Sequence, residues 1–288
     1  MDTIRLGSRA FGPGDLAVMA IVNRTPDSFF DRGATFAADA ALRAVERAIA
    51  QGADIIDIGG VKAGPGEAVD TAEEVRRTVG TVAAVRAAFP DVVISIDTWR
   101  PEVATEAVAA GADLINDTWA GADPGLAEVA AATGAGLVCS HAGGLAPRTR
   151  PHRAAFDDVV GDVLATVTRL AARAVALGVR EDAILIDPAH DFGKNTRHSL
   201  ALTRHLDELV ATGWPVLVAL SNKDFIGETL DLPVADRLEG TLAATAVSAW
   251  LGARVFRAHQ VAPTRMVLDM VSAIRGDRPP AVARRGLA

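Results

Sequence analysis

The feature that most constrains this fold is an alternation, repeated eight times, of a short apolar run and a longer stretch with helical spacing. The apolar runs are rich in valine and isoleucine, as is typical of strands buried on both faces of a sheet. Eight such repeats in 288 residues predict an α/β protein, a single-domain (β/α)8 TIM barrel. The runs begin at Leu16, Asp54, Val92, Asp113, Gly136, Ile184, Pro215 and Arg254.

The stretches between these runs predict eight helices. They are rich in alanine, and glycine often follows them, where this residue fits a left-handed helix cap. An open, doubly wound sheet is the alternative, but the number of repeats and the lack of a GxGxxG turn after the first run argue against it. The predicted helices span residues 40–51, 71–88, 101–110, 126–133, 157–177, 200–212, 237–251 and 264–274.

The repeats also set the expected domain limits. No linker or shift in composition separates a second domain, so residues 16–278 form one predicted barrel domain. Residues 1–15 are expected to be a peripheral lead-in. Residues 279–288 are expected to be a mobile tail, because chain ends outside the repeats have few contacts to hold them.

The overall charge and the cysteine content exclude several classes of function. The net charge is −7 with a pI near 5.4, and no long stripe of lysine and arginine occurs, which argues against nucleic acid or an anionic membrane as the partner. The apolar run Leu16–Val22 is too short to span a bilayer, and no secretory signal precedes it. Cys139 is the single cysteine, which excludes an internal disulfide and fits a reducing compartment. We expect a soluble, cytoplasmic protein.

Polar side chains stand where the predicted strands end. In a barrel these carboxyl ends meet on one face, where active sites lie. A single polar strand end is explained by helix capping, but eight that include acids, a lysine, an arginine and two histidines predict a polar pocket. The residues are Asn23, Asp57, Asp97, Asn116, Asp117, Ser140, His141, Asp187, Ser221, Asn222, Lys223, Asp224, Arg257 and His259.

Other reactive residues have structural explanations. Cys139 lies inside an apolar run, so we interpret it as a core residue rather than a nucleophile. His141 either contacts a ligand or is a strand-end histidine with its own partner. A zinc hydrolase needs clustered ligands, such as a His-x-His pair after the first strand, and the sequence has none there. The segment with Arg148, Arg150 and Arg153 is either a solvated loop or a lid over an anion.

The strand ends and the loops that follow them resemble the signatures of the dihydropteroate synthase family. The resemblance extends from about Leu16 to Arg275 and implies a pterin-binding (β/α)8 barrel. The motifs, in that family's order, are MAIVNRTPDSFFDRG, IIDIGG with GPG after it, SIDTWRPEVA, INDTWAG, SHAGG, IDPAHDFGK, SNKDFIGETL and FRAHQV.

The resemblance implies a chemistry and a set of partners. In that family a pterin pyrophosphate loses its pyrophosphate, and the amine of p-aminobenzoate captures the resulting pterin-methyl cation. The residue types suit this reaction, because a carboxylate accepts two N–H donors of a pterin edge and an arginine binds pyrophosphate as a planar fork. Mg²⁺ on the pyrophosphate makes it a better leaving group. The family's dimer uses its later helices, so a homodimer is also implied.

The same resemblance implies roles for seven residues. Four of them would hold the pterin, and two of these four, Asp97 and Lys223, would also take part in catalysis. Two more would bind pyrophosphate, and the last would lie at the metal end of the site. Asp97, Asn116, Asp187 and Lys223 would hold the pterin, Arg257 and His259 would bind pyrophosphate, and Asn23 would lie at the metal end.

The chain departs from the family in the loop after the second strand. There the family reads Gly-Gly-Glu-Ser-Thr-Arg-Pro-Gly, and its threonine and arginine help to enclose p-aminobenzoate. This chain instead reads Gly59, Gly60, Val61, Lys62, Ala63, Gly64, Pro65, Gly66. Ala63 and Gly64 thus replace the threonine and the arginine, and Lys62 offers only a flexible positive charge in exchange.

Further departures follow the last three strands. Where the family has Ser-Arg-Lys-Ser, Asn222 replaces the arginine and Asp224 replaces the serine near the aminobenzoate carboxylate. Gln260 replaces the aspartate of the family's His-Asp-Val. After the sixth strand, Ala189 stands in place of a glycine and His190 in place of an aromatic residue.

These departures gather on the side of the second substrate, while the pterin side is retained. A hydrogen bond to a charged group contributes roughly 1.5–3 kcal/mol, so losing one or two weakens a ligand by roughly tenfold to ten-thousandfold. Asp224 would add a like charge beside a benzoate carboxylate. The pattern resembles the diverged second-copy synthases that some bacteria carry, which are thought to lack synthase activity. We therefore expect weak or absent activity.

Three functions stay open from the sequence. The first is an enzyme, either an active dihydropteroate synthase of folate biosynthesis or a relative that joins the pterin to another nucleophile. The second is a non-catalytic pterin-binding or regulatory protein. The third is a pterin-dependent methyltransferase module, which shares the barrel but needs a corrinoid-binding partner.

Overall fold

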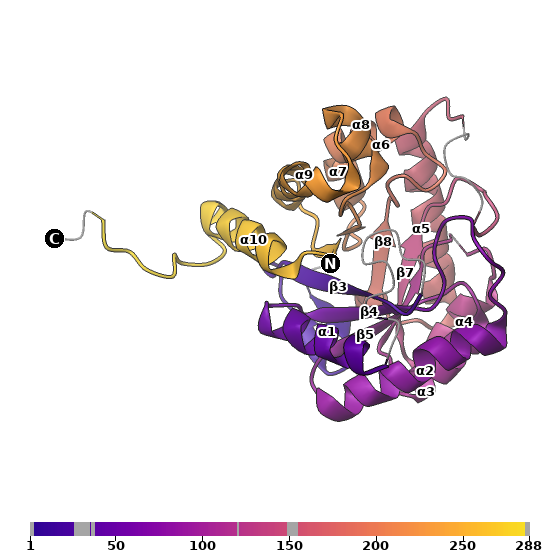
Figure 1. Ribbon diagram of the computed structural model, residues 1–288. Coiled ribbons are helices and arrows are strands. Elements are labelled where there is room, and N and C mark those ends of the chain that lie inside the picture. The colour runs from indigo at the N-terminus through magenta and orange to yellow at the C-terminus, as the bar shows by residue number, and fades with distance from the viewer. Residues whose placement is uncertain (1–2, 26–34, 36–37, 120, 149–154, 286–288) are drawn as a thin grey trace.

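The computed structural model describes residues 3–25, 35, 38–119, 121–148 and 155–285. Within these residues, eight parallel strands form a nearly closed barrel wrapped by helices (Figure 1), which confirms the predicted fold. The strands are β3 (Ala17–Asn23), β4 (Ile55–Gly59), β5 (Val93–Asp97), β6 (Leu114–Asp117), β7 (Gly136–Ser140), β8 (Ile184–Asp187), β9 (Leu217–Val218) and β10 (Val255–Ala258). Their hydrogen-bonded order is β8-β7-β6-β5-β4-β3-β10-β9, and a parallel bridge between Ile186 and Val216 joins its two ends.

The helices follow the predicted stretches closely, with two exceptions. The stretch 200–212 lies in two helices, α6 and α7, that are separated at His205. Helix α8, which begins at Asp224, is not among the predicted stretches. The helices are α1 (Ala38–Ala50), α2 (Thr71–Ala88), α3 (Pro101–Ala109), α4 (Gly125–Thr133), α5 (Val159–Leu177), α6 (Thr196–Arg204), α7 (Leu206–Val210), α8 (Asp224–Leu230), α9 (Leu238–Trp250) and α10 (Val261–Arg275). Short 3-10 turns, η1 (Glu181–Ala183) and η2 (Val234–Asp236), precede β8 and α9.

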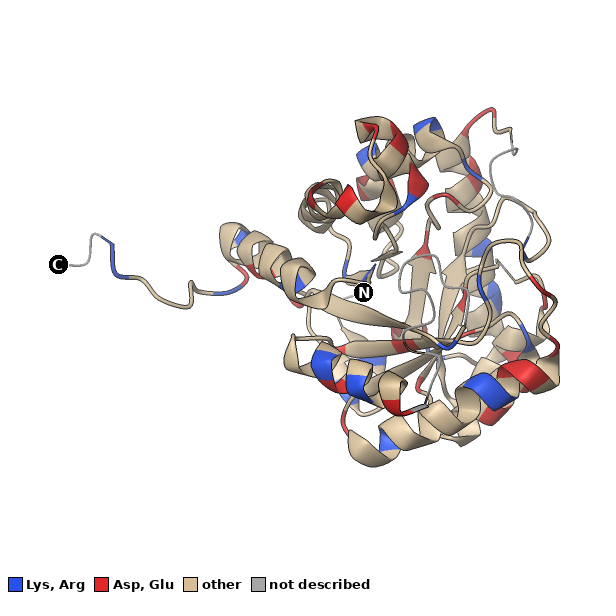
Figure 2. Ribbon diagram, in the orientation of Figure 1, with Lys and Arg blue, Asp and Glu red and all other residues tan. Residues whose placement is uncertain are grey.

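Capping side chains explain where several helices begin. Asp70 accepts a hydrogen bond from the backbone N–H of Glu73 at the start of α2, and Asp158 accepts two at the start of α5. Asn195 and His198 form a reciprocal capping box on α6. Each cap satisfies backbone donors that the first turn of a helix leaves open. Acidic and basic residues are interspersed along the outer helices (Figure 2).

The strands alternate between two buried apolar clusters. In β5, for example, Val93 belongs to the cluster inside the barrel, whereas Ile94 and Ile96 belong to the one beneath the helices. Towards the carboxyl end the inward positions become polar, first Ser95 and then Asp97. The strand sequence itself therefore builds an apolar floor and a polar mouth.

The N-terminal residues close the amino end of the barrel. Strands β1 (Ile4–Leu6) and β2 (Arg9–Phe11) form an antiparallel hairpin. Its side chains Ile4, Leu6 and Phe11 are buried in the cluster inside the barrel. Three side chains of the expected lead-in thus belong to the core, while Gly7, Ser8 and Ala10 between them are exposed. The domain limits at residues 16 and 278 stay a prediction.

The C-terminal residues that the structure describes extend away from the barrel (Figure 1), and residues 279–285 are exposed. The mobility of this tail stays a prediction. Among the helices that the structure describes, none combines the length and the apolar character needed to cross a membrane.

Candidate functional site

A buried carboxylate, Asp57, organises the mouth of the barrel. It lies in the middle of β4 and is fully buried. Its two oxygens accept hydrogen bonds from Arg257 Nε at 2.6 Å, Ser95 Oγ at 2.7 Å and Asn116 Nδ2 at 3.3–3.4 Å. A buried charge requires partners of this kind, so Asp57 sets the orientation of side chains on three other strands.

Arg257 joins Asp57 to a second carboxylate, Asp97. Its Nη2 donates to Asp97 Oδ2 at 2.7 Å, and the other oxygen of Asp97 accepts a hydrogen bond from Thr118 Oγ1 at 3.3 Å. The planar guanidinium thus bridges two carboxylates on neighbouring strands. Burial raises the pKa of Asp97 to about 7, and the positive charge of Arg257 acts against this shift. We call Asp57, Asp97, Arg257 and Asn116 the Asp57 network.

Asp187 ends β8, and Lys223 lies beyond β9 as the N-cap residue of α8, at the same end of the barrel as the Asp57 network. Asp187 Oδ1 accepts a hydrogen bond from the backbone N–H of Ala189 at 2.7 Å. The Lys223 ammonium donates to the backbone carbonyl of His190 and lies over the ring of Phe192, 4.9 Å from its centroid. Burial raises the pKa of Asp187 and lowers that of Lys223, and each charge opposes the shift of the other.

The turn after β8 is tightly constructed. Ala189 and Asp191 adopt left-handed backbone angles, with φ of 50° and 68°, which costs a non-glycine residue roughly 1 kcal/mol each. Lys194 holds this turn together, because its buried ammonium donates to the carbonyls of His141, Ala189 and Phe192. Burial lowers the pKa of Lys194 to about 7.

His190 fixes the same turn from its other side. Its ring is fully buried, stacks on Phe225 of α8 and contacts Thr203 Oγ1 through Nε2 at 3.0 Å. Its carbonyl accepts the Lys223 hydrogen bond. Sequence reasoning gave His190 no role, yet it positions the predicted catalytic lysine.

The substituted residues after β9 and β10 contact one another. Asn222 Nδ2 and Ser221 Oγ both donate to Gln260 Oε1, at 3.1 and 3.3 Å. Asn222 and Gln260 stand at the positions where the resembled family carries an arginine and an aspartate. Two neutral side chains in contact with each other thus replace two charged ones. Nearby, His259 Nδ1 lies 2.9 Å from Ser221 Oγ. Burial lowers the pKa of His259 to about 3, with help from the charges of Arg257 and Lys223, so this imidazole is neutral at pH 7.

Asp224 and the loop after β4 occupy the outer rim. The Asp224 side chain is 79% exposed and forms an ion pair with Arg237 at 2.9 Å, which offsets part of its negative charge. Arg148, from the loop after β7, donates to the carbonyls of Gly64 at 3.3 Å and Glu67 at 2.6 Å. It therefore ties two loops together across the rim. Arg150 and Arg153, named with it in the sequence, lie outside the described residues.

The predicted metal end of the site is Asn23. It is the last residue of β3 and lies opposite Gly59 in the register with β4. An amide oxygen is a hard ligand that suits Mg²⁺. In the part of the chain that the structure describes, no group of three His, Cys, Asp or Glu side chains could hold a metal ion. The Asn23 amide oxygen could supply one ligand to a Mg²⁺ ion whose other ligands are substrate phosphates and water.

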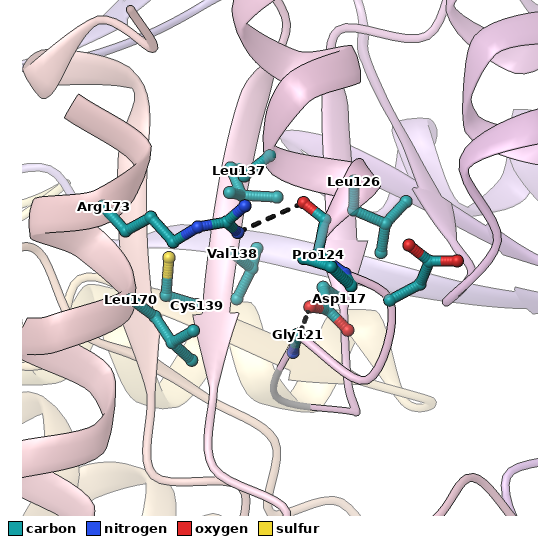
Figure 3. Close-up of a pocket in the computed structure, with 11 residues that line it drawn as sticks. Asp117, Gly121, Pro124, Leu126, Leu137, Val138, Cys139, Leu170 and Arg173 are labelled. Atoms are coloured by element: carbon teal, nitrogen blue, oxygen red, sulfur yellow. Dashed lines mark hydrogen bonds between the residues drawn. The ribbon is translucent and has the colours of Figure 1, made fainter. Parts of the chain in front are cut away.

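A separate small cavity lies behind the barrel wall, on the outer side of β6 and β7 (Figure 3). Its volume is about 20 Å³, room for roughly one water molecule. Asp117 lines it, and its carboxylate already accepts the backbone N–H groups of Trp119 and Gly121. Cys139 is buried there, and burial raises the pKa of its thiol, which agrees with a core residue. This cavity does not suit an organic substrate.

The structure therefore places all seven of the predicted residues on one rim of the barrel. It joins Asp97, Asn116 and Arg257 directly in the Asp57 network. Sequence reasoning named Asp57 as a strand residue but gave it no role. The available signal was a charged residue in the middle of the apolar run DIIDI, which is costly to bury without a partner. The roles of the seven residues stay proposals.

Comparisons with known proteins agree on one family. The family model described as "Pterin binding enzyme" matches residues 19–259. The chain is 61% identical to the inactive dihydropteroate synthase 2 of Mycobacterium leprae, over 94% of both chains. It is 37% identical to the dihydropteroate synthase of Escherichia coli, over 89% of this chain and 90% of that one.

Solved structures agree with these matches. The Yersinia pestis dihydropteroate synthase with a sulfonamide drug complex is 35% identical and superposes with a TM-score of 0.90, covering 96% of this chain and 100% of that chain. A solved Mycobacterium tuberculosis protein is 50% identical, with a TM-score of 0.74 over 96% of this chain and 99% of that one.

The raised pKa of Asp97 predicts how stability changes with pH. An unfolded aspartate titrates near pH ~4, whereas Asp97 in the folded protein titrates at about 7. Between these values the folded protein binds a proton that the unfolded chain has released. The contribution of Asp97 to the free energy of unfolding therefore falls as the pH rises from about 4 to about 7. An Asp97→Asn variant cannot titrate and should gain stability relative to the parent over this range.

Thermal unfolding of both proteins at several pH values tests this. The Tm of Asp97→Asn minus the Tm of the parent should increase by roughly 2–4 °C or more between acid and neutral pH. A difference that stays constant would show that Arg257 keeps Asp97 ionised throughout and would overturn the expectation.

Proposed function

Because this chain belongs to the family of pterin-binding enzymes that contains the dihydropteroate synthases, we propose that the mouth of its barrel binds a pterin of the 6-hydroxymethyl-7,8-dihydropterin pyrophosphate type. We further propose that its p-aminobenzoate subsite is altered, so that ordinary synthase activity is weak or absent. The observation that carries the first part is the Asp57 network, with Asp187 and Lys223 at the same end of the barrel.

The pterin half combines acceptors and donors that match a pterin ring. Asp187 supplies a carboxylate for two adjacent N–H donors of the ring. Asn116 donates through Nδ2 to the Asp57 carboxylate, which can only accept hydrogen bonds. The Oδ1 atom of Asn116 is therefore left as a further acceptor for the ring. Lys223 donates to ring oxygen or nitrogen. Asp97, beside Arg257, would stabilise positive charge that develops on the pterin-methyl group.

The pyrophosphate end of this proposal involves three residues. Two N–H groups of Arg257 are engaged by Asp57 and Asp97, which leaves Nη1 to reach an anion. His259 is neutral at pH 7, so it can donate a hydrogen bond but adds no positive charge. Asn23 would supply one oxygen to a Mg²⁺ ion carried by the pyrophosphate, and that ion would make pyrophosphate a better leaving group.

The second-substrate half lacks the charge recognition that p-aminobenzoate needs. Asn222 and Gln260 form a neutral hydrogen-bonded pair where the synthases resembled by this chain carry opposite charges. Ala63 and Gly64 bring neither a hydroxyl nor a guanidinium to the loop after β4. The Arg237 partner of Asp224 weakens its repulsion of a carboxylate without reversing it.

A non-catalytic pterin-binding role is the second candidate. The observation that favours it is the name of the 61% identical relatives, inactive dihydropteroate synthase 2. Pyrophosphate release from the pterin substrate, with and without p-aminobenzoate, separates it from an enzyme. A cytoplasmic setting is part of the proposal, since Cys139 is buried and reduced, and cell fractionation tests it.

A homodimer formed through the last two helices is also part of the proposal. Helices α9 and α10 pack against each other and expose large apolar side chains. Met266, Met270 and Ile274 are 59–70% exposed and recur every four residues along one face of α10. Trp250, at the end of α9, is 60% exposed. An apolar face of this kind suits a second copy of the same chain.

Asp187→Asn should weaken binding of 6-hydroxymethylpterin by about tenfold to a hundredfold, because a neutral amide cannot accept both ring donors. Titration calorimetry measures this. Asp117→Asn is the matched control, since Asp117 also ends a strand and is buried, but faces the small cavity behind the wall. Its affinity should equal that of the parent. Equal affinities for all three proteins would refute the assignment. In the same assay, Mg²⁺ should strengthen the binding of the pterin pyrophosphate but not that of 6-hydroxymethylpterin, because the ion is held through the pyrophosphate.

A reversal of the altered subsite should restore p-aminobenzoate binding. The structure shows that Asn222→Arg must be paired with Gln260→Asp, because the two side chains are in contact. These are combined with Ala63→Thr, Gly64→Arg and Asp224→Ser. A side chain at Gly64 has room, since its Cβ would meet only Lys62, at 3.9 Å. In the presence of pyrophosphate, the product released from the pterin substrate, the combined variant should bind p-aminobenzoate roughly tenfold or more tighter than the parent does.

The control for this reversal is Asn222→Arg alone. It places a charge beside a neutral amide in a buried position and should destabilise the protein instead of restoring binding. Turnover of the parent with p-aminobenzoate at roughly 1 per second or faster would contradict the altered subsite. So would a combined variant that binds p-aminobenzoate no better than the parent.

Replacing Met266 and Met270 with glutamate should convert the dimer to a monomer, because charges on this face would have to be buried in the interface. Sedimentation velocity measures the change. Val175→Glu, on the exposed side of α5, is the control and should leave the parent dimer intact. A parent that is a monomer, or a double variant that stays dimeric, would disprove the assigned interface.

A further inference from the structure

Ser140, the last residue of β7, has a buried hydroxyl group with no partner in the part of the chain that the structure describes. The residue is fully buried, and its Oγ makes no hydrogen bond to any residue that the structure describes. A hydroxyl removed from water normally gains a replacement hydrogen bond, because leaving it unpaired is destabilising. A buried, unpaired group of this kind requires a physical explanation.

The strand pattern shows which way Ser140 points. Along β7, Val138 belongs to the cluster inside the barrel and Cys139 to the cluster beneath the helices. Side chains alternate along a strand, so Ser140 faces inward again. In the register with β8, Ser140 lies directly opposite Asp187, which ends its own strand on the inside of the barrel. The unpaired hydroxyl is therefore beside the carboxylate assigned to the pterin.

A second unpaired group lies on the neighbouring strand on the other side. Asn116 of β6 is buried, and its Oδ1 has no hydrogen-bond partner among the described residues. Its orientation is set by Asp57, because the Nδ2 group donates to that carboxylate. Three consecutive strands, β6, β7 and β8, thus direct an amide oxygen, a hydroxyl and a carboxylate toward the inside of the barrel.

We propose that the Ser140 hydroxyl is a specificity-determining contact of this site, which donates a hydrogen bond to a ring nitrogen or carbonyl oxygen of the bound heterocycle. This inference rests on the proposed function. Asp187 and the Asn116 oxygen can only accept hydrogen bonds, so they read N–H groups of the ring. Ser140 lies between them in strand order and can donate. Together the three strands select a flat nitrogen heterocycle whose edge carries an acceptor as well as donors.

The test compares two neighbouring residues on opposite faces of β7. Ser140→Ala removes the inward hydroxyl, and Cys139→Ala removes the outward thiol from the core beneath the helices. Calorimetry with 6-hydroxymethylpterin gives the affinity, and thermal unfolding without ligand gives the stability. Ser140→Ala should raise the Kd about threefold to tenfold, because one hydrogen bond to the ligand is lost. Its Tm should equal or exceed that of the parent, because the unpaired hydroxyl is gone.

Cys139→Ala should show the opposite pattern, with a lower Tm from the cavity in the core and an unchanged Kd. If Ser140→Ala binds the pterin as tightly as the parent, or loses thermal stability, the hydroxyl has a structural partner and the inference is wrong. If the parent itself binds no pterin, the proposed function fails, a result distinct from the failure of the Ser140 contact alone.

Discussion

The polar mouth of this barrel depends on the ion pair between Asp57 and Arg257. Asp57 is fully buried and the Arg257 side chain is only 17% exposed, so neither charge could remain there alone. Once paired, they hold Asn116 and Asp97 in fixed orientations through single hydrogen bonds. Removing either charge would leave its partner uncompensated, so side chains on four strands would lose hydrogen bonds that orient them. The site is therefore as rigid as the barrel that carries it, which is the condition for recognising a flat ring by its edge.

Charge also explains how one half of the site could change without disturbing the fold. The Asn222 and Gln260 side chains replace an arginine and an aspartate of the related synthases, and they still form a hydrogen bond to each other. Changing one partner alone would bury an unpaired charge, whereas changing both exchanges an ion pair for a neutral pair at small cost. Two substitutions 38 residues apart in the chain are therefore one physical change.

Sequence patterns predicted the strands, most helix limits and the polar strand ends, because these depend on local periodicity and on the convergence of strand ends in a barrel. They could not predict that Arg257 reaches Asp57 across 200 residues. They also could not show that Arg237 pairs with Asp224, or that the carbonyl of His190 holds Lys223. Nor could they show that Ile4 and Leu6 pack inside the barrel, because that contact depends on the open amino end of the folded barrel.

The residues that differ from the synthases lie in the segments that follow the strands, and none of them lies on a strand itself. Three residues proposed to hold the pterin, Asp97, Asn116 and Asp187, lie with Asp57 on strands whose geometry the core enforces. Three residues of the proposed second-substrate half, Ala63 and Gly64 in a loop and Asp224 at a helix start, lie where a new side chain meets solvent or a single neighbour. Substitution on a strand must preserve a network of charges held among the strands, whereas substitution at these three positions disturbs few contacts. A barrel of this construction can therefore lose recognition of one substrate while its fold continues to present a complete site for the other.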